Sequence, residues 1–485
     1  MTAMLDRLNA TGRTGLFIGG EWLSASDGET IDVIDPATEE HLADVASGST
    51  DDGVRAVEAA AAAAPAWADT APRRRSEVLR RAFELVSERE KDFAELITRE
   101  NGKALADAAG EVRYAAEFLR WFSEEAVRIR GESYRSPAGD KRVTVGYQPV
   151  GVSVLVTPWN FPIAMGTRKI GPALAAGCTV VMKPASDTPL VSLALAEVFE
   201  DAGCPPGVLN VVPAHRSGPV VESMLADSRV RKLSFTGSTE TGRLLLAHAA
   251  KRVLNVSMEL GGNAPFLVLA DADLDQAVEG GIQAKMRNAG EACTAANRFY
   301  VHDAVADEFA DRLARAMASL TVGSGMDEET DVGPLINAPS RDKVAELVED
   351  AASDAVLMTG GTSPAGKGFY YLPTVLKDVA RNAGILSSEI FGPVAALVRF
   401  DDLDDVIRQA NDTEMGLISY VFTGDEAAGM RIAERLEAGM VAVNRGIISD
   451  PATPFGGMKQ SGIGREGSHH GLTEFQETKY IGSNW

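Results

Sequence analysis

The 485-residue chain has few cysteines and few aromatic residues, and it has no long apolar run. Its three cysteines, Cys178, Cys204 and Cys293, are widely spaced and form neither a disulfide framework nor a metal-binding pattern. No stretch reaches the roughly 18 apolar residues of a membrane span, and the first residues lack the apolar core of a signal peptide. We therefore expect a cytoplasmic protein without a metal site, in which Cys178 and Cys204 are structural.

Positive charge is scarce as well. The chain has 47 Lys and Arg against 69 Asp and Glu, which gives a formal net charge of −22. This balance argues against a nucleic-acid partner and favours a soluble, self-repelling protein without a membrane partner. The apolar content of 45% and the charged content of 24% are ordinary for a globular protein. The length allows two or three domains with substantial cores.

Hydrophobic patterning predicts an α/β fold. Runs rich in β-branched residues alternate with helical segments such as Leu190–Asp201 and Thr239–Ala250. The runs are Val152–Val156, Thr179–Lys183, Val208–Val212, Lys232–Thr236 and Leu254–Met258. This alternation is typical of a parallel sheet with helices on both faces. Nearer the start, Asp51 and Asp52 can cap a helix that reaches about Trp67, and the apolar residues of Ser76–Glu100 follow helical spacing.

Three residue types with complementary chemistry stand out along the chain. Cys293 follows a long helical stretch, Glu259 ends a strand before two glycines, and Asn160 follows another strand. A thiol, a carboxylate and an amide together indicate nucleophilic chemistry at a carbonyl carbon. Taken singly, each signal is weak, because a lone cysteine is more often buried as a small hydrophobe than used as a nucleophile.

The order and wording of these motifs resemble the aldehyde dehydrogenase superfamily over almost the whole chain. The matches run from Leu16-Phe17-Ile18-Gly19-Gly20-Glu21-Trp22 to Gly462-Ile463-Gly464-Arg465-Glu466-Gly467. The resemblance implies a Rossmann-like cofactor domain at 1–129 and 150–260, and a catalytic domain at 261–443. It also implies oligomerisation elements at 130–149 and 466–485, with a substrate-mouth loop at 444–465. We accordingly expect a homodimer or homotetramer; from the residues alone, 130–149 could equally be a simple surface hairpin.

The resemblance implies a nicotinamide cofactor. Ser234–Arg243 follows a strand and opens a helix, and a helix N-terminus attracts phosphate. In the family this turn, with Gly237, Ser238 and Gly242, lies at the pyrophosphate. The family wording Lys-Pro-(Ser/Ala)-Glu is here Lys183-Pro184-Ala185-Ser186, without the carboxylate that repels a 2′-phosphate, so we expect NADP in preference to NAD. Asp187 could restore some repulsion. The other cofactor positions implied are Thr157, Pro158, Trp159, Leu260, Glu389 and Phe391.

The resemblance also implies a mechanism. Cys293 attacks the aldehyde carbon, Asn160 and the Cys293 backbone N–H stabilise the oxyanion, and Glu259 activates the water that hydrolyses the thioester. Because an acylating enzyme that uses coenzyme A usually lacks such a base, we expect a free acid as product. Lys169 and Glu466 match further polar positions that assist proton movement or cofactor contact. In place of the Gln common two residues before the nucleophile, this chain has Glu291, whose effect on the thiol is left open.

Within the superfamily, the chain resembles the succinate-semialdehyde dehydrogenases most closely. Their phrases recur at Thr167-Arg168-Lys169, Arg287–Gly290, Ala296-Asn297-Arg298 and Gly446-Ile447-Ile448-Ser449. A substrate with a distal carboxylate needs cationic anchors, and the resemblance assigns this role to Arg168, Arg298 and Ser449. The alternative for Arg298 is a solvated or structural arginine.

Two departures accompany this resemblance. Ala295 stands where some of these enzymes have a second cysteine that forms a redox-switch disulfide, and Arg445 replaces the usual Thr before Gly446. We predict oxidation of succinate semialdehyde. A glutarate-semialdehyde or broader aldehyde dehydrogenase, and a catalytically silent structural member of the family, are the alternatives.

Overall fold

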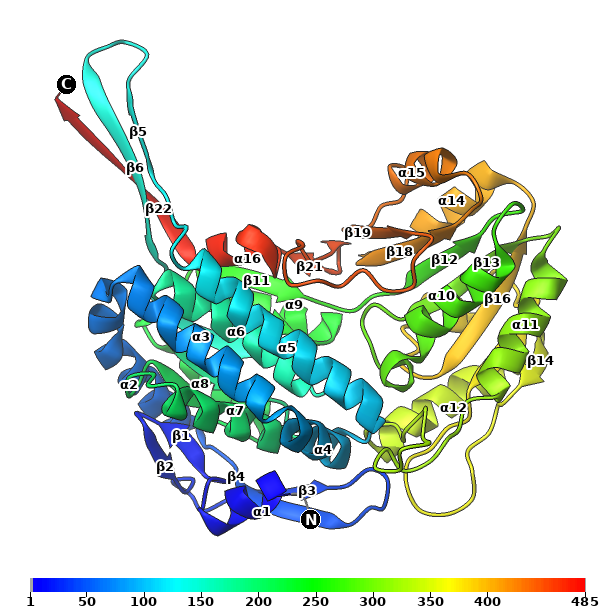
Figure 1. Ribbon diagram of the computed structural model, residues 1–485, viewed down its shortest axis with the longest axis horizontal. Helices are drawn as coiled ribbons and strands as arrows, with labels where there is room; N and C mark the ends of the chain where they lie inside the picture. The colour runs from blue at the N-terminus through cyan, green and yellow to red at the C-terminus, as the bar shows by residue number, and fades with distance from the viewer. Residues whose placement is uncertain (1–2, 485) are drawn as a thin grey trace.

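Two α/β halves and a projecting arm make up the computed structural model, which describes residues 3–484 (Figure 1). Residues 1–2, in the first predicted domain, and Trp485, at the end of the predicted terminal strand, lie outside the described residues. Each half is built on its own mainly parallel sheet. The predicted α/β class is confirmed.

The first sheet has eight strands in the order β2-β1-β9-β8-β7-β10-β11-β21. Strands β7 to β11 pair in parallel, and β1, β2 and β21 are added antiparallel. Their bounds are β1 Leu16–Ile18, β2 Glu21–Leu23, β7 Val152–Val156, β8 Val180–Lys183, β9 Leu209–Val211, β10 Val230–Thr236, β11 Asn255–Glu259 and β21 Gly462–Ile463. The chain runs from β7 outward to β8 and β9, and then returns to β10 on the other side. Open α/β sheets bind ligands at such a reversal, beyond the carboxyl ends of the strands.

Helices cover both faces of this sheet because apolar side chains point from its strands to each face in turn. Leu155 packs in one core with the residues of α3, α5, α6 and α7, whereas Val154 and Val156 pack in another with α2, α8 and α9. The helix bounds are α1 Ala3–Ala10, α2 Thr50–Asp69, α3 Pro72–Glu88, α4 Glu90–Asn101, α5 Leu105–Glu125, α6 Pro162–Ala176, α7 Pro189–Asp201, α8 Ser217–Ala226, α9 Thr239–Ala250 and α16 Ser468–Thr473.

The second sheet has seven strands in the order β14-β15-β16-β13-β12-β18-β19, all parallel except the edge strand β14. Its strands are β12 Ala264–Val268, β13 Ala296–His302, β14 Val356–Thr359, β15 Thr374–Lys377, β16 Val394–Phe400, β18 Ile418–Phe422 and β19 Met440–Val443. Its helices are α10 Leu274–Met286, the 3₁₀ turn η1 Arg287–Gly290, α11 Ala306–Ala318, α12 Ala338–Ala352, α13 Gly384–Ser387, α14 Leu403–Asn411 and α15 Glu426–Ala433. The short pair β17 Met415–Gly416 and β20 Met458–Lys459 lies apart from both sheets.

A three-stranded antiparallel arm projects from the first half in the order β22-β6-β5 (Figure 1). Strands β5 Glu132–Arg135 and β6 Lys141–Pro149 flank the predicted turn, and β22 Gln476–Asn484 comes from the C-terminal segment. The arm exposes the apolar side chains of Tyr134 and Ile481 to solvent. Segments from opposite ends of the chain thus form one extension, with edge strands on both sides.

Two helix predictions are corrected by the structure. The Ser76–Glu100 region divides into α3 and α4 at Arg89, where φ is −105° and ψ is 19°. The cap of α2 is Ser49, whose hydroxyl accepts from the Asp52 backbone N–H while the Asp52 carboxylate accepts from the Ser49 backbone N–H. Asp52 therefore belongs to a capping box inside the first turn rather than at the cap itself.

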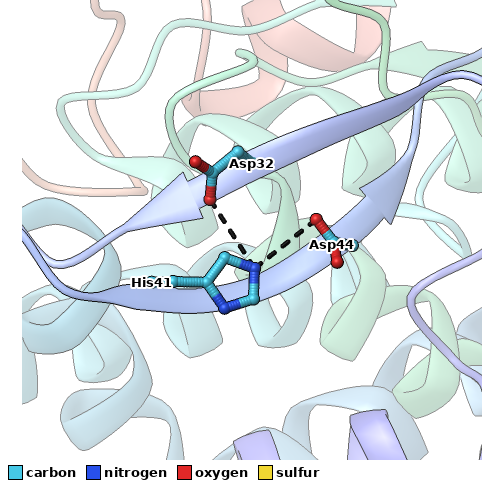
Figure 2. Close-up of side chains that lie close together, drawn as sticks. All are labelled: Asp32, His41 and Asp44. Carbon is cyan, nitrogen blue, oxygen red and sulfur yellow. Dashed lines mark ion pairs between the residues drawn. The ribbon is translucent and has the colours of Figure 1, made fainter.

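A small charge cluster lies on the separate hairpin of β3 Thr30–Ile34 and β4 His41–Ala46 (Figure 2). Asp32 and Asp44 are directly opposed across the strands, and the His41 ring nitrogen lies 3.6 and 3.4 Å from their carboxylates. All three side chains are exposed. Among residues 3–484, no helix is long and apolar enough to cross a bilayer.

Candidate active site

A cavity of about 280 Å³ lies at the carboxyl ends of β7, β10 and β11, facing the loop that leads into β13. Asn160 enters it after β7, Glu259 at the end of β11, and Cys293 from the second half. The cavity also contains many of the other residues that the sequence pointed to: Pro158, Trp159, Arg168, Gly237, Ser238, Leu260, Glu389 and Phe391. Residues from both sheets therefore build one site.

The Cys293 loop begins in an unusual backbone. Asn288, Ala289 and Gly290 all have positive φ, of 52°, 51° and 80°. A side chain at Gly290 would come within 2.2 Å of the Gly392 carbonyl oxygen. Left-handed backbone is costly for Ala289 and persists only where the surroundings enforce it. The turn redirects the chain after α10 so that Cys293 reaches the cavity.

Burial dominates the electrostatics of the nucleophile. Burial raises the pKa of the Cys293 thiol to about 12. The nearby Arg168 and Arg287 cations oppose this increase. The carboxylates of Glu389 and Glu259 add to the increase. The cavity itself therefore keeps the thiol protonated, and attack requires a base to take the proton.

Glu259 is suited to be that base. Its side chain is buried, and neither carboxyl oxygen has a hydrogen-bond partner among the described residues. Desolvation, with a further contribution from Glu466, holds the pKa of Glu259 well above its usual range, although Lys169 and Arg168 oppose the shift. A carboxyl with a raised pKa can exchange protons near neutral pH.

Asn160 offers an amide donor to the same cavity. Its Nδ2 donates to the Glu291 carbonyl oxygen at 3.0 Å, and its Oδ1 has no partner among the described residues. An amide has two N–H donors, so the second remains available to a ligand. The side chain is anchored on one side and can donate on the other.

A row of buried polar groups lies beside Glu259. The Lys169 ammonium donates to Ser234 Oγ at 2.9 Å and contacts one oxygen of Glu466. Arg168 reaches the other oxygen of Glu466 at 3.4 Å and donates to the Tyr114 hydroxyl at 3.2 Å. Lys169 and Glu466 thus lie behind the cavity, whereas Arg168 also lines it.

The turn after β10 has the features of a phosphate site. Ser238 caps the 12-residue helix α9, whose first N–H groups face outward at its start. A side chain at Gly242 would come within 2.4 Å of Leu260 Cδ2, and one at Gly237 within 2.5 Å of the Phe235 ring. Only glycine fits at these two positions, and the turn can therefore lie close to the pyrophosphate of a bound dinucleotide.

Lys183 ends β8, at the same edge of the first sheet as the turn after β10. Its ammonium donates to Ser217 Oγ at 2.8 Å, and burial lowers the pKa of Lys183 to about 8, with Asp187 opposing the shift. Ser186 is half-buried. Asp187 accepts a hydrogen bond from Asn337 Nδ2 at 3.3 Å, so its charge is partly satisfied by the second half. A cation with hydroxyls around it fits the phosphate end of NADP better than a free carboxylate does.

The opposite side of the cavity is formed by Glu389 and Phe391. Glu389 accepts from the Gly262 backbone N–H at 3.1 Å, and its carboxylate lies against Gly261, where a Cβ would come within 2.8 Å. Phe391 has φ of 56° and meets Trp159 edge to face at 5.4 Å. Thr157 donates its backbone N–H to the Lys183 carbonyl at 3.2 Å and does not line the cavity. Thr157 therefore joins β7 to β8 behind the site.

The predicted role of Arg298 as an anchor for the substrate carboxylate is corrected by the structure. Its guanidinium donates to the backbone carbonyls of Asn263 at 3.0 Å, Gln409 at 3.1 Å and Ala410 at 2.9 Å. It is buried in the core of the second half and does not line the cavity with Cys293. A guanidinium occupied by carbonyls has little left to offer a substrate carboxylate, so Arg298 is structural.

Arg287 is the cation that the sequence reasoning missed. It lines a small cleft with Ser449 and Tyr420, stacks 4.6 Å from the Phe161 ring centre, and lowers the pKa of Cys293. Its signal was present in the Arg287–Gly290 phrase, six positions before the nucleophile. Only the fold shows that Arg287 and Ser449 share a cleft.

Glu291 points away from the thiol. Its Oε1 accepts from the Ile336 backbone N–H at 3.1 Å, and burial holds the pKa of Glu291 well above its usual range. A protonated Glu at this position resembles the Gln that the family commonly has.

Comparisons with known proteins agree with this geometry. Residues 22–481 match the aldehyde dehydrogenase family. The chain is 54% identical over 442 residues to a succinate-semialdehyde dehydrogenase of Paenarthrobacter nicotinovorans, covering 91% of this chain and 98% of that protein. It is 51% identical over 470 residues to a glutarate-semialdehyde dehydrogenase of Pseudomonas putida, covering 97% of each. A crystal structure described as an E. coli NADP dependent enzyme superposes with a TM-score of 0.96 at 49% identity, over 98% of each chain.

Proposed function

Because this chain belongs to the aldehyde dehydrogenase family, we propose that it oxidises succinate semialdehyde to succinate with NADP as the hydride acceptor. Family membership makes it an oxidoreductase that acts on aldehydes. One observation carries the mechanism: Cys293, Glu259 and Asn160 line a single cavity, and the Glu259 carboxyl is buried there without a hydrogen-bond partner among residues 3–484.

The reaction begins at the thiol. Glu259 takes the proton of Cys293 as the sulfur bonds to the aldehyde carbon, and the carbonyl oxygen becomes an oxyanion. The free N–H of the Asn160 amide and the Cys293 backbone N–H donate to that oxygen. Loss of one such donor typically lowers turnover by about 10²–10³.

Hydrolysis completes the cycle. NADP, when bound, supplies the acceptor for the hydride that leaves the reacting carbon, so that a thioester remains on Cys293. Glu259, having released its first proton, takes one from water as the water oxygen attacks the thioester carbon. The carbon–sulfur bond breaks, succinate leaves, and the thiol is restored. Lys169 and Glu466, beside Glu259, are our proposed outlet for the proton that Glu259 releases.

The carboxylate of the substrate is anchored by Arg168, Arg287 and Ser449 in this proposal. Arg168 lines the main cavity, and Arg287 and Ser449 line the adjoining cleft. Guanidinium groups suit the planar geometry of a carboxylate. The succinate-semialdehyde dehydrogenase of Paenarthrobacter nicotinovorans, at 54% identity, supports the same substrate.

Selection of NADP is proposed to rest on Lys183 and Ser186. Ser186 donates to a 2′-phosphate and Lys183 pairs with it, while Gly237, Ser238 and Gly242 hold the pyrophosphate. Glu389 holds the nicotinamide ribose, and Phe391 packs near the ring beside Trp159. The structural neighbour described as NADP dependent supports this choice.

Glutarate semialdehyde is the second candidate substrate. The Pseudomonas putida relative, at 51% identity, is named for it. Arg445 is exposed in the outer groove that also contains Ser449, where it can reach a longer dicarboxylic semialdehyde. We further propose a homodimer or homotetramer that pairs through the arm of β5, β6 and β22.

Initial-rate kinetics test these assignments. Succinate semialdehyde, glutarate semialdehyde and butanal are each compared with NADP and with NAD. We expect kcat/KM for succinate semialdehyde to exceed that for butanal by at least about tenfold, or about 1.4 kcal/mol. An equal kcat/KM for butanal would contradict carboxylate binding by the arginines. Faster turnover with NAD would contradict the role of Ser186. Higher kcat/KM for glutarate semialdehyde would transfer the assignment to the second candidate.

A further inference from the structure

A buried ion pair lies beneath the segment that carries Asn160. The Lys103 ammonium donates to Glu111 Oε2 at 2.6 Å, and both side chains are 0% exposed. Lys103 also donates to the Asn160 backbone carbonyl at 2.7 Å, and its nitrogen lies 4.2 Å from the centre of the Phe161 ring. The cation is thus shared between a carboxylate and the Asn160 segment.

Glu111 extends this connection into α6. Its second oxygen, Oε1, accepts from the backbone N–H groups of Ile163 at 3.1 Å and Ala164 at 3.2 Å, in the first turn of the helix. The first N–H groups of a helix lack intrahelical partners, and a negative charge is favoured there. The ion pair therefore fixes the chain on both sides of Phe161: at the Asn160 carbonyl before it and at the helix start after it.

Asn288 completes the connection from the nucleophile loop. Its Nδ2 donates to the carbonyl oxygens of Asn160 at 3.0 Å and Glu291 at 3.2 Å, and its backbone N–H donates to Asp107 on α5 at 2.8 Å. The Asn160 amide donates to the same Glu291 carbonyl. The peptide of Asn160 is consequently held both by Lys103, just before α5, and by the turn that leads to Cys293.

Stability alone does not account for this ion pair. Burial lowers the pKa of Lys103, and Glu111 opposes that shift. Replacing a buried ion pair with apolar residues of similar volume is often neutral or stabilising. Positioning is a different matter, because a displacement of about 1 Å at a reacting centre can cost about 100-fold in rate.

We propose that Lys103 and Glu111 are positioning residues, which hold the Asn160 peptide so that the free N–H of its amide faces the aldehyde oxygen in the cavity. The inference rests on the proposed function, since it acts through Asn160 on the attack by Cys293. Neither residue exchanges a proton with the substrate. Both act through hydrogen bonds to the backbone around Asn160.

A double-mutant cycle of Lys103→Met with Asn160→Ala tests the inference. We expect Lys103→Met alone to lower kcat about tenfold or more, while KM for NADP changes by less than about twofold. In the Asn160→Ala background the same change should lower kcat by less than about twofold, because the donor that it positions is gone. Equal losses in both backgrounds would show a general structural effect and overturn the inference.

Two further variants keep the test decisive. Arg75 is a matched control, since it is a buried cation that donates to the carbonyls of Ala175 at 3.1 Å and Thr70 at 2.6 Å away from the cavity. Arg75→Met should lower the melting temperature while kcat changes by less than about twofold. If Lys103→Met does not fold, the cycle is run with Lys103→Met and Glu111→Gln combined, which removes both charges and keeps an acceptor for the start of α6.

The single variant Asn160→Ala separates two kinds of failure. If it leaves kcat unchanged, the oxyanion donor of the proposed function is wrong. If it lowers kcat but the loss from Lys103→Met persists undiminished beside it, only the positioning inference is wrong.

Discussion

At the scale of single residues, the cavity combines a protonated thiol with a carboxyl whose pKa is raised. Both shifts arise first from burial, and the arginines near Cys293 reduce its shift without cancelling it. The chemistry proposed for the site follows from this combination, because the attack requires transfer of the Cys293 proton to Glu259.

Glu259→Gln should abolish turnover, because both the attack by Cys293 and the hydrolysis of the thioester need this base, and at the same time it should alter stability in a pH-dependent way. A carboxyl with a raised pKa in the folded state contributes stability below its unfolded pKa and loses it as pH rises. The variant should therefore unfold at a higher temperature than the wild type at about pH 8, with little difference at about pH 4. Thermal unfolding at both pH values and steady-state turnover measure this. A gain in stability that is equal at both pH values would contradict the assignment.

Arg287→Gln and Arg298→Gln should have opposite signatures. Arg287 lines the cleft with Ser449, so its loss should raise KM for succinate semialdehyde about tenfold or more, while KM for butanal changes by less than about twofold. Arg298 is bonded to backbone carbonyls, and its loss leaves buried acceptors without a partner, so it should lower stability by about 1–3 kcal/mol. Kinetics with both aldehydes and denaturant unfolding separate them. A selective KM effect at Arg298 would restore it to the substrate site.

Ser186→Glu should shift cofactor preference from NADP towards NAD. The new carboxylate repels a 2′-phosphate and accepts hydrogen bonds from ribose hydroxyls. We expect the ratio of kcat/KM for NADP over NAD to fall by at least about tenfold. Ser186→Ala serves as the uncharged control, and an unchanged ratio in the Glu variant would show that residue 186 does not read the phosphate.

At the scale of elements, strands were predicted better than contacts between distant segments. The β7 bounds match the predicted run, and β8 to β11 lie within a residue or two of theirs, because β-branched residues mark buried strands directly. The break between α3 and α4 was not visible, since the apolar spacing continues past Arg89.

In the active site, too, roles that depend on distant segments could not be predicted from the sequence. Cys293, Glu259 and Asn160 could be singled out from local wording, whereas the role of Arg298 depends on Gln409 and Ala410, more than a hundred positions away. No local sequence pattern indicates a role for the Lys103–Glu111 pair, because that role depends on the contact of Lys103 with the distant Asn160 carbonyl.

Helix α9 provides a prediction at this scale. Gly242→Ala places a Cβ within 2.4 Å of Leu260 Cδ2, so Leu260, which lines the cavity, must move. We expect KM for NADP to rise about fivefold or more while KM for succinate semialdehyde stays constant. Gly110→Ala in α5, where the added Cβ meets no atom within 4 Å, is the matched control and should keep both values. Equal effects of the two changes would contradict a cofactor role for α9.

At the scale of the whole molecule, the arm projects away from the two halves of the chain (Figure 1). Strands β5 and β22 are both edges, and Tyr134, Tyr480 and Ile481 are about half exposed, at 48%, 56% and 55%. Exposed edges and apolar side chains together favour pairing with a second copy.

Ile481→Lys should therefore weaken assembly. A charge on the edge strand opposes pairing. We expect the molar mass from light scattering to fall towards that of one 51.3 kDa chain at concentrations where the wild type is an oligomer. Leu244→Lys, another exposed apolar residue but on α9, should leave the molar mass unchanged. A wild type that is already monomeric would contradict the proposed assembly.

The division of the catalytic groups between the two halves has a practical consequence. Asn160 and Glu259 belong to the first sheet and Cys293 to the second, so neither half possesses a working centre. Turnover therefore depends on the relative position of the two halves. Mild denaturant should abolish activity while both sheets remain intact. A small molecule wedged between the halves, far from the sulfur, could act as an inhibitor that no competition with aldehyde relieves.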